Sequence, residues 1–215
     1  MPVLYDYFRS SAAFRVRIAL RLKGIAYASH EVHLLRAGGE QHGAAYRAVN
    51  PAELVPSYDD GTGPITQSLA ILEYLEETAP TPALLPASPR ARAFVRSLAL
   101  SVACDIHPLC NLRVQEQLST AFGASDDART LWLRHWIEKG LGAVEAMLAG
   151  HPRTSPFAHG DTPTLADLCI VPQVTNALRF GCDLTGVARI TALYDHCMAL
   201  PAFALSAPDA CAPPP

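Results

Sequence analysis

Residues 5–24 of the chain read YDYFRSSAAFRVRIALRLKG. An apolar run ends at Arg-Ser-Ser and passes directly into a segment with apolar residues at helical spacing, which Gly24 closes. Adjacent serines are good helix caps, and the unpaired amides of a first helical turn also attract anions. The stretch therefore predicts a strand at residues 2–8, a helix at residues 11–24, and a candidate anion site between them.

The segments that follow extend this beginning into a small α/β domain. The pattern predicts strands at residues 26–35, 53–60 and 63–67, and an amphipathic helix at residues 68–80 capped by Ser68. The order is βαβ followed by ββα, which predicts a parallel first pair and an antiparallel hairpin. This is the thioredoxin-like arrangement, and we assign it to residues 1–80.

The rest of the chain has helical periodicity. A Pro-rich linker at residues 81–89 precedes an all-helical domain at residues 90–215, whose Pro-rich tail we expect to fray. The expected helices cover residues 90–122 with a bend near Pro108, 126–150, 164–181 and 190–200. Thr164 and Asp167 are close to a capping box, which indicates a folding role for that motif.

Composition excludes several classes of function. The 215 residues are 50% hydrophobic and 17% charged, with a net charge of −3, and they contain no basic tract for nucleic acid. We see no signal peptide and no uninterrupted apolar run of about 20 residues that would span a membrane. The six cysteines form no Cys-x-x-Cys pair, so we expect no metal, no disulfide framework and a cytoplasmic location.

Two dipeptides in the first domain can carry chemistry. Pro56 interrupts a strand pattern, and a cis bond after Val55 would leave the Val55 backbone free to pair with an extended peptide. A simple edge proline is the alternative, and it is favoured for the bond alone because only about 5–6% of X–Pro bonds are cis. Gln67-Ser68 begins a helix, where a cap and a carboxylate site are both plausible.

Four segments taken together resemble a known family. They are SSAAFRVRIALRLKG, NPAELVPSYDDG, QSLAILEYLEETAPTPALLP and GDTPTLADLCIVPQV, and they are similar to the zeta class of glutathione transferases. The resemblance runs from about residue 3 to about residue 203. It implies the glutathione transferase fold, glutathione as cofactor, a homodimer and a role in aromatic catabolism.

The resemblance also implies roles for individual residues. Val55 would pair with the cysteinyl backbone of glutathione, and Gln41 would reach toward the tripeptide. Gln67 and Ser68 would hold its γ-glutamyl head, and Ser10 and Ser11 would hydrogen-bond its sulfur. A thiol has a pKa of about 8.5, and a hydroxyl donor at a helix N-terminus favours the thiolate. The zeta pattern has a cysteine where this chain has Ala12, so no protein thiol can act as nucleophile there.

A second group of implied residues lies in the helical domain. His107 and Asn111 are four residues apart, which predicts one helix face, and the resemblance implies that this face lies opposite the sulfur. A hydrogen-bonded histidine at a helix kink is the alternative for His107. Asp105 would reach the glutathione amino group of a partner subunit.

The resemblance also implies that three arginines are ligands for substrate carboxylates. They are Arg9, Arg113 and Arg179, and a guanidinium fork fits a carboxylate bidentately. Three ordinary surface arginines are the alternative. Arg15 and Arg17 are expected to serve helix packing and ion pairs instead.

The leading hypothesis is a glutathione-dependent cis–trans isomerase of maleyl compounds. The thiolate would add to the double bond, the resulting single bond would rotate, and elimination would give the fumaryl isomer. One alternative is a transferase that conjugates or dehalogenates small α-halo acids, and another is a glutathione-binding scaffold without turnover. Sequence does not separate maleylpyruvate from maleylacetoacetate, although His107 and the three arginines favour maleylpyruvate slightly.

Overall fold

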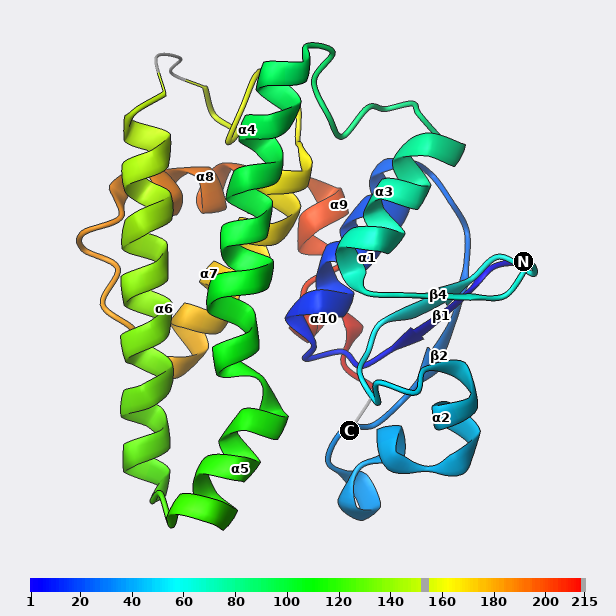
Figure 1. Ribbon diagram of the computed structural model, residues 1–215. Coiled ribbons are helices and arrows are strands. Elements are labelled where there is room, and N and C mark those ends of the chain that lie inside the picture. Colours follow the sequence, from blue (N-terminus) through cyan, green and yellow to red (C-terminus); the bar gives the residue numbers. More distant parts are fainter. Residues whose placement is uncertain (152–154, 214–215) are drawn as a thin grey trace. The chain divides into compact units, whose positions relative to one another are not determined.

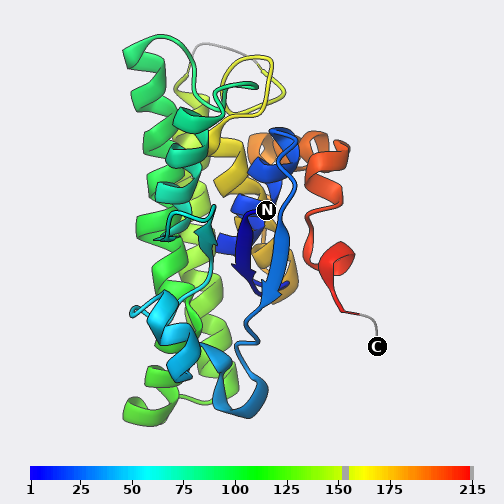
Figure 2. The same cartoon turned by 90° about the vertical axis from the view of Figure 1, so that its right-hand side faces the viewer.

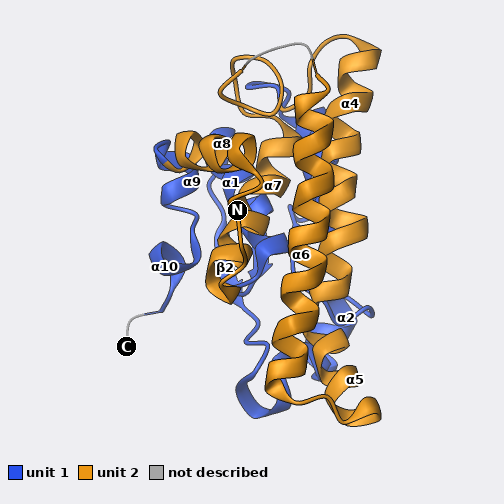
Figure 3. Ribbon diagram, turned by 90° about the vertical axis from the view of Figure 1, so that its left-hand side faces the viewer, with its two compact units in different colours: residues 1–83, 199–215 blue, residues 84–198 orange. Residues whose placement is uncertain are grey.

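The computed structural model describes residues 1–151 and 155–213, which divide into two compact units (Figure 3). The first unit contains residues 1–83 together with the chain from Ala199 onward, and the second contains Leu84–Met198. The division at residue 83 falls inside the expected linker. The C-terminal segment, however, groups with the first unit, whereas the sequence assigned it to the helical domain.

The first unit is built on a four-stranded sheet with the order β2-β1-β3-β4. Strand β1 (Val3–Asp6) runs parallel to β2 (Ala28–Glu31) and antiparallel to β3 (Ser57–Asp59). Strand β3 then pairs antiparallel with β4 (Pro64–Thr66). Both predicted pairings are therefore confirmed, and with them the thioredoxin-like fold class.

Helices α1 (Ser11–Leu22) and α3 (Ser68–Thr78) pack against each other in this unit (Figure 1). Every residue of α1 from Ser11 to Leu20 is buried, so the helix is enclosed on all sides and not on one face only. The connection between β2 and β3 holds two 3₁₀ turns and a short helix; they are Arg36–Gly38, Glu40–His42 and α2 (Ala44–Val49).

Arg17 is a buried hub of the first unit. Its Nη1 atom lies 2.7 Å and 2.9 Å from the two carboxylate oxygens of Asp6 at the end of β1. Its Nη2 atom donates to the Phe8 carbonyl at 3.0 Å, and its Nε atom donates to the Ser206 carbonyl at 2.9 Å. The side chain therefore holds the end of β1, the turn before α1 and the C-terminal segment together, as expected for an ion-pairing arginine.

The C-terminal segment that was expected to fray contains regular structure among its described residues. Two short helices follow α8, namely α9 (Pro201–Ala204) and α10 (Pro208–Cys211), and α9 contacts α1. Figure 2 shows this segment in red, on the side of the blue elements of the first unit. The proline-rich composition suggested disorder, but burial of Ser206 and its bond to Arg17 hold the segment in place.

The second unit is helical, as predicted. Its long elements are α4 (Pro89–Leu100), α6 (Asp126–Ala149), α7 (Leu165–Phe180) and α8 (Ala188–Met198). The capping box predicted at the start of α7 is present: the Asp167 carboxylate accepts the Thr164 N–H at 2.7 Å.

The segment expected as one helix with a bend is interrupted more deeply. After α4 come a π-helical turn at Ser101–Ile106 and a 3₁₀ turn at His107–Cys110, and only then α5 (Leu112–Phe122). Pro108 lacks an amide proton for the α-helical ladder, which accounts for the break. The segment packs closely against Gly140 of α6. A side chain at that position would overlap Ile106, because its Cβ atom would lie 2.3 Å from Ile106 Cγ1.

The stretch Pro89–Phe122 is apolar and poorly covered within the chain. Among the described residues it alone has the length and composition to cross a membrane, although no uninterrupted apolar run was found in the sequence. Only 28% of its most apolar window is buried. Leu100, 46% exposed, is part of this open face.

Candidate functional site

The turn between β1 and α1 presents hydrogen-bond donors, as the sequence predicted. Ser10 is the N-cap of α1, and its hydroxyl accepts the Ala13 N–H at 3.2 Å. A hydroxyl has one proton to donate, so Ser10 remains able to donate after this bond. Within residues 1–151 and 155–213, no hydrogen bond engages the Ser11 hydroxyl or the amides of Ser11 and Ala12. The first turn of α1 therefore offers hydroxyls and open amides to an anion.

The start of α3 is also open, but its cap differs from the prediction. Gln67, not Ser68, is the N-cap residue, and no side chain caps the helix. Gln67 is exposed and has a φ of 69°, a left-handed conformation that costs a non-glycine residue about 1–3 kcal/mol and that is frequent at functional sites. Within the described chain, the amides of the first turn that begins at Ser68 have no acceptor, which suits a carboxylate.

Ser68 has a different partner from the one its position suggested. Its hydroxyl accepts a hydrogen bond of 3.0 Å from Arg15 Nη1, and both side chains are buried. Arg15 therefore does more than pack α1: it brings a positive charge directly behind the start of α3. Such a charge favours a carboxylate at the open amides.

The backbone of Val55 is free, and its neighbours are fixed. The Val55–Pro56 bond is cis, and no hydrogen bond in the described chain uses the Val55 N–H or carbonyl. The preceding Leu54 carbonyl accepts from Tyr46 Oη at 2.7 Å and from Asn50 Nδ2 at 2.6 Å. This arrangement leaves Val55 able to pair with an extended peptide, as the sequence suggested.

Gln41 lies in the turn Glu40–His42 and is buried. Its Nε2 atom contacts the Leu34 carbonyl at 3.4 Å and His42 Nε2 at 3.0 Å. Its Oε1 atom is buried and accepts no hydrogen bond from any described residue. An unsatisfied buried acceptor is unusual in a native protein and suits a donor from a ligand.

The expected common face of His107 and Asn111 is not formed. His107 begins the 3₁₀ turn, whereas Asn111 has an extended backbone with ψ of 149° and caps α5. The Asn111 side chain accepts the Arg113 N–H at 3.2 Å. Residues four apart share a face only in a continuous α-helix. The break at Pro108 interrupts the helix between His107 and Asn111, so the prediction of a common face fails.

The second unit nevertheless brings its candidate residues to one region. Trp132 Nε1 near the start of α6 donates to the Leu109 carbonyl at 2.8 Å, and Arg134 Nε donates to the Phe180 carbonyl at 2.8 Å. The same end of α6 therefore lies beside the His107–Arg113 segment and beside the end of α7, which carries Arg179. Arg113 and Arg179 are both exposed, and the Arg179 guanidinium lies 4.5 Å from the centre of the Phe180 ring.

Two thiols in this region are kept neutral. Burial, together with the neighbouring Cys182, raises the pKa of Cys110 to about 12. Burial and the Glu138 carboxylate raise the pKa of Cys182 to about 11. Neither cysteine is a nucleophile near neutral pH, because the reactive form of cysteine is the thiolate.

Comparison with known proteins identifies the family. Residues 4–83 match the family described as "Glutathione S-transferase, N-terminal domain". The chain is 48% identical over 208 residues to the maleylpyruvate isomerase of a Ralstonia species, covering 96% of this chain and 97% of the relative. It is also 48% identical over 212 residues to the maleylacetoacetate isomerase of Rhizobium meliloti, covering 98% of each.

Solved structures agree with these relatives. A holo maleylpyruvate isomerase, described as a bacterial zeta-class glutathione S-transferase, superposes with a TM-score of 0.94 at 47% identity and 97% coverage of each chain. The maleylacetoacetate isomerase of Methylobacterium extorquens, solved with bound malonate and glutathione, also gives a TM-score of 0.94, at 42% identity and 99% coverage of each chain. The chain belongs to the zeta class of the glutathione transferases.

Three residues that shape the candidate site of this zeta-class transferase were not assigned to it from the sequence. Arg15 supports Ser68, and Tyr46 and Asn50 hold the Leu54 carbonyl beside Val55. Arg15 and Ser68 are 53 residues apart, so no local pattern links them. The sequence indicates the roles of Tyr46 and Asn50 only weakly. It shows a polar residue four positions after an aromatic residue, at the end of a short helix.

Proposed function

We propose that the chain is a glutathione-dependent cis–trans isomerase that converts maleylpyruvate or maleylacetoacetate to the fumaryl isomer. The observation that carries the proposal is the set of unpaired backbone groups in the first unit. They are the Val55 backbone, the first amides of α1 and the first amides of α3. Together they fit a peptide with a carboxylate at one end and an anionic sulfur in its middle.

The residues of the first unit would hold glutathione in a defined orientation. Val55 would pair with its cysteinyl backbone, while Gln67 and Ser68 would hold its γ-glutamyl head. The buried Oε1 atom of Gln41 would accept one of its donors. Ser10 would donate to the sulfur, because a hydroxyl that already accepts an N–H is polarised toward donation. Ser11 would add a second donor.

When bound, glutathione supplies the sulfur nucleophile that adds to the substrate double bond and leaves it again. Arg9, Arg113 and Arg179 would bind the substrate carboxylates and stabilise the negative charge that develops beside them. His107 and Asn111 would complete the glutathione contacts. Ala12 leaves the chain without a thiol of its own at the turn, so the nucleophile must come from the bound peptide.

We also propose a cytoplasmic homodimer. All six cysteines are free thiols, which suits a reducing compartment. The open apolar face of Pro89–Phe122 suits a second copy of the chain, because apolar patches of this kind mark interfaces in soluble proteins. In that dimer, Asp105, which is exposed, would reach the glutathione of the partner subunit.

One experiment tests the function directly. Purified protein is assayed with maleylpyruvate and with maleylacetoacetate, each with and without glutathione. We expect turnover to the fumaryl isomer only with glutathione and without consumption of it. A stable thioether product would instead indicate a conjugating transferase. Glutathione binding without turnover of either substrate would indicate a scaffold protein.

A further inference from the structure

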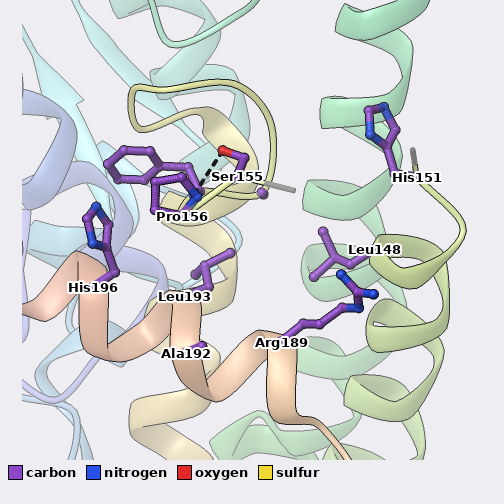
Figure 4. A pocket seen from close by; sticks show the side chains of 10 residues that line it. Leu148, His151, Ser155, Pro156, Arg189, Ala192, Leu193 and His196 are labelled. Carbon is purple, nitrogen blue, oxygen red and sulfur yellow. Dashed lines mark hydrogen bonds between the residues drawn. The ribbon is translucent and has the colours of Figure 1, made fainter. Parts of the chain in front are cut away.

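The second unit contains a pocket with a volume of about 360 Å³ that none of the proposed site residues lines (Figure 4). Leu148 at the end of α6, Phe157 and Leu193 of α8 give it an apolar floor, and all three are buried. His151, Arg189 and His196 stand around it with their polar groups. Its volume is at the lower end of the range of small-molecule sites, about 300–1,000 Å³.

The pocket is separate from the proposed site within the second unit. The His107–Arg113 segment and the end of α7 lie beside Trp132 and Arg134 of α6. Leu148 follows Trp132 by sixteen residues of the same helix. At 1.5 Å per residue, the two places are about 24 Å apart along α6.

Among the described residues that line the pocket, the ionisable side chains are one arginine and two histidines, and none is acidic. Within the described residues, the Arg189 guanidinium has neither an ion pair nor a hydrogen bond. Glu145, the nearby acid on α6, is occupied: its carboxylate accepts the backbone N–H groups of Arg189 and Ile190 at 3.1 Å and 3.0 Å. An anion in the pocket would therefore meet an unneutralised guanidinium.

The imidazole rings of His151 and His196 each contact a phenylalanine ring. The His151 ring stacks on Phe94 with centroids 4.2 Å apart, and the His196 ring meets the edge of Phe157 at 4.8 Å. Figure 4 shows His151 and Arg189 on one side of the pocket and His196 on the other. The Ser155 hydroxyl accepts the Phe157 N–H at 3.2 Å and donates to Gly160, so its proton is already used. Arg189 is thus the permanently charged donor among the described residues that line the pocket.

We propose that this pocket binds a small aromatic monocarboxylate. The ring would lie on the apolar floor, where flat faces and edges of the neighbouring rings suit an aromatic ligand. The carboxylate would take two parallel hydrogen bonds from the Arg189 fork. A single carboxylate matches the one guanidinium among the described lining residues, and the apolar floor disfavours a compact, fully hydrated anion such as phosphate.

The probe is benzoate, titrated calorimetrically into the full-length protein saturated with glutathione. We expect saturable binding with a Kd of about 1 mM or tighter, and at least about tenfold weaker binding of acetate and of inorganic phosphate. Arg189→Gln should weaken benzoate about tenfold or more. Arg189→Lys keeps the charge but loses the guanidinium fork, so its affinity for benzoate should lie between those of the wild type and Arg189→Gln. Ala192→Trp, at an exposed lining position, should block binding by filling the pocket.

Two controls separate this pocket from other sites. Arg90→Gln removes an exposed arginine of α4, in the same unit, and should leave benzoate binding unchanged. Arg113→Ala should also leave it unchanged. No saturable heat with benzoate would overturn the proposal, as would benzoate binding that resists Arg189→Gln and Ala192→Trp. Loss of benzoate binding in Arg113→Ala alone would assign the ligand to the proposed substrate site, whose function the isomerase assay tests independently.

Discussion

Ser10 does two things with one hydroxyl group. It accepts the Ala13 N–H and so begins α1, and it keeps its own proton for an anion in front of the helix. Ser11 lies one position further on, is buried, and takes no part in capping. The two adjacent serines therefore have different structural roles, which makes their substitution informative.

We expect Ser10→Ala to raise the pKa of the bound glutathione thiol more than Ser11→Ala does. Loss of the donor should raise that pKa by about one unit, and loss of the cap should lower the free energy of unfolding by about 1 kcal/mol. The measurements are the ultraviolet absorbance of the thiolate against pH and urea unfolding. Ser10→Thr retains a capping hydroxyl and is the control. A larger pKa change in Ser11→Ala would reverse the assignment.

Arg113 is expected to act on the substrate and not on glutathione. Its replacement by alanine should lower isomerase turnover by about 10²–10³, the usual cost of losing one group that stabilises developing charge. Glutathione affinity should stay within about twofold, as measured by calorimetry. Arg90→Ala removes an exposed arginine of α4 and should change neither quantity. Equal losses of turnover and affinity in Arg113→Ala would contradict its role.

Much of the local geometry of the candidate site in the first unit could be predicted from the sequence, because its signals lie within short segments. Serines at a strand-to-helix turn and a proline within a strand pattern can both be recognised from a few adjacent residues. The cap of α3 was misplaced by one residue, because propensity gives no reason for Gln67 to adopt a φ of 69°. The support of Ser68 by Arg15 depends on a contact over 53 residues and leaves no local signal.

At the scale of elements, the π-helical turn Ser101–Ile106 depends on a glycine in another helix. Gly140 of α6 faces Ile106 so closely that any side chain would overlap it. Periodicity predicted one helix with a bend near Pro108 and no π-helical turn, since a sequence pattern does not reveal a contact between residues that lie far apart in the chain. The glycine therefore fixes where the segment carrying His107 runs.

We expect Gly140→Ala to destabilise the protein by about 1–3 kcal/mol, because its Cβ atom would lie 2.3 Å from Ile106 Cγ1. Gly142→Ala is the matched control in the same helix, since nothing lies within 4 Å of its added Cβ. That substitution should stabilise by about 0.4–1 kcal/mol through helix propensity and chain entropy. Urea unfolding measures both. Equal effects at the two positions would show that Gly140 does not govern the contact.

The start of α7 predicts a dependence of stability on pH. Burial raises the pKa of Asp167 to about 6, although three hydrogen bonds from Ala158 and Thr164 act to lower it. The folded protein therefore holds a proton that the unfolded chain, with a pKa of 3.8, releases earlier. Between these two values the folded state binds more protons, so stability falls as pH rises.

Relative to Asp167→Asn, we expect the wild-type free energy of unfolding to fall by on the order of 3 kcal/mol between pH 4 and pH 6.5. Urea unfolding of both proteins across this range isolates Asp167, because the other titrating groups are common to them. A difference that is flat, or that grows as pH rises, would mean that the carboxylate is ionised throughout.

At the scale of the whole molecule, the C-terminal segment is part of the first unit, in which we propose that glutathione binds. Ser206 accepts a buried hydrogen bond from Arg17, 189 residues earlier, and Arg17 also holds the Phe8 carbonyl just before the serines. A contact over such a distance cannot be inferred from a proline-rich composition, which is why the sequence suggested a frayed end.

Truncation after Leu205 should therefore weaken glutathione binding as well as stability. Removing the Ser206 carbonyl leaves a buried Arg17 donor unsatisfied, which costs about 1–3 kcal/mol. Thermal melting with and without glutathione measures both effects. Truncation after Ala212 keeps Ser206 and α10 and is the control. If both truncations behave like the full chain, the segment has no part in the site.

The interrupted course of the first unit also bears on its biogenesis. Residues 1–83 are synthesised before the second unit, but the residues that complete the first unit, from Ala199 onward, are synthesised after it. The second unit is contiguous, so every part of it has emerged before that completion is possible. A nascent chain stalled after Met198 would accordingly contain the whole second unit, while Arg17, beside the serine turn, would still lack its hydrogen bond to the Ser206 carbonyl.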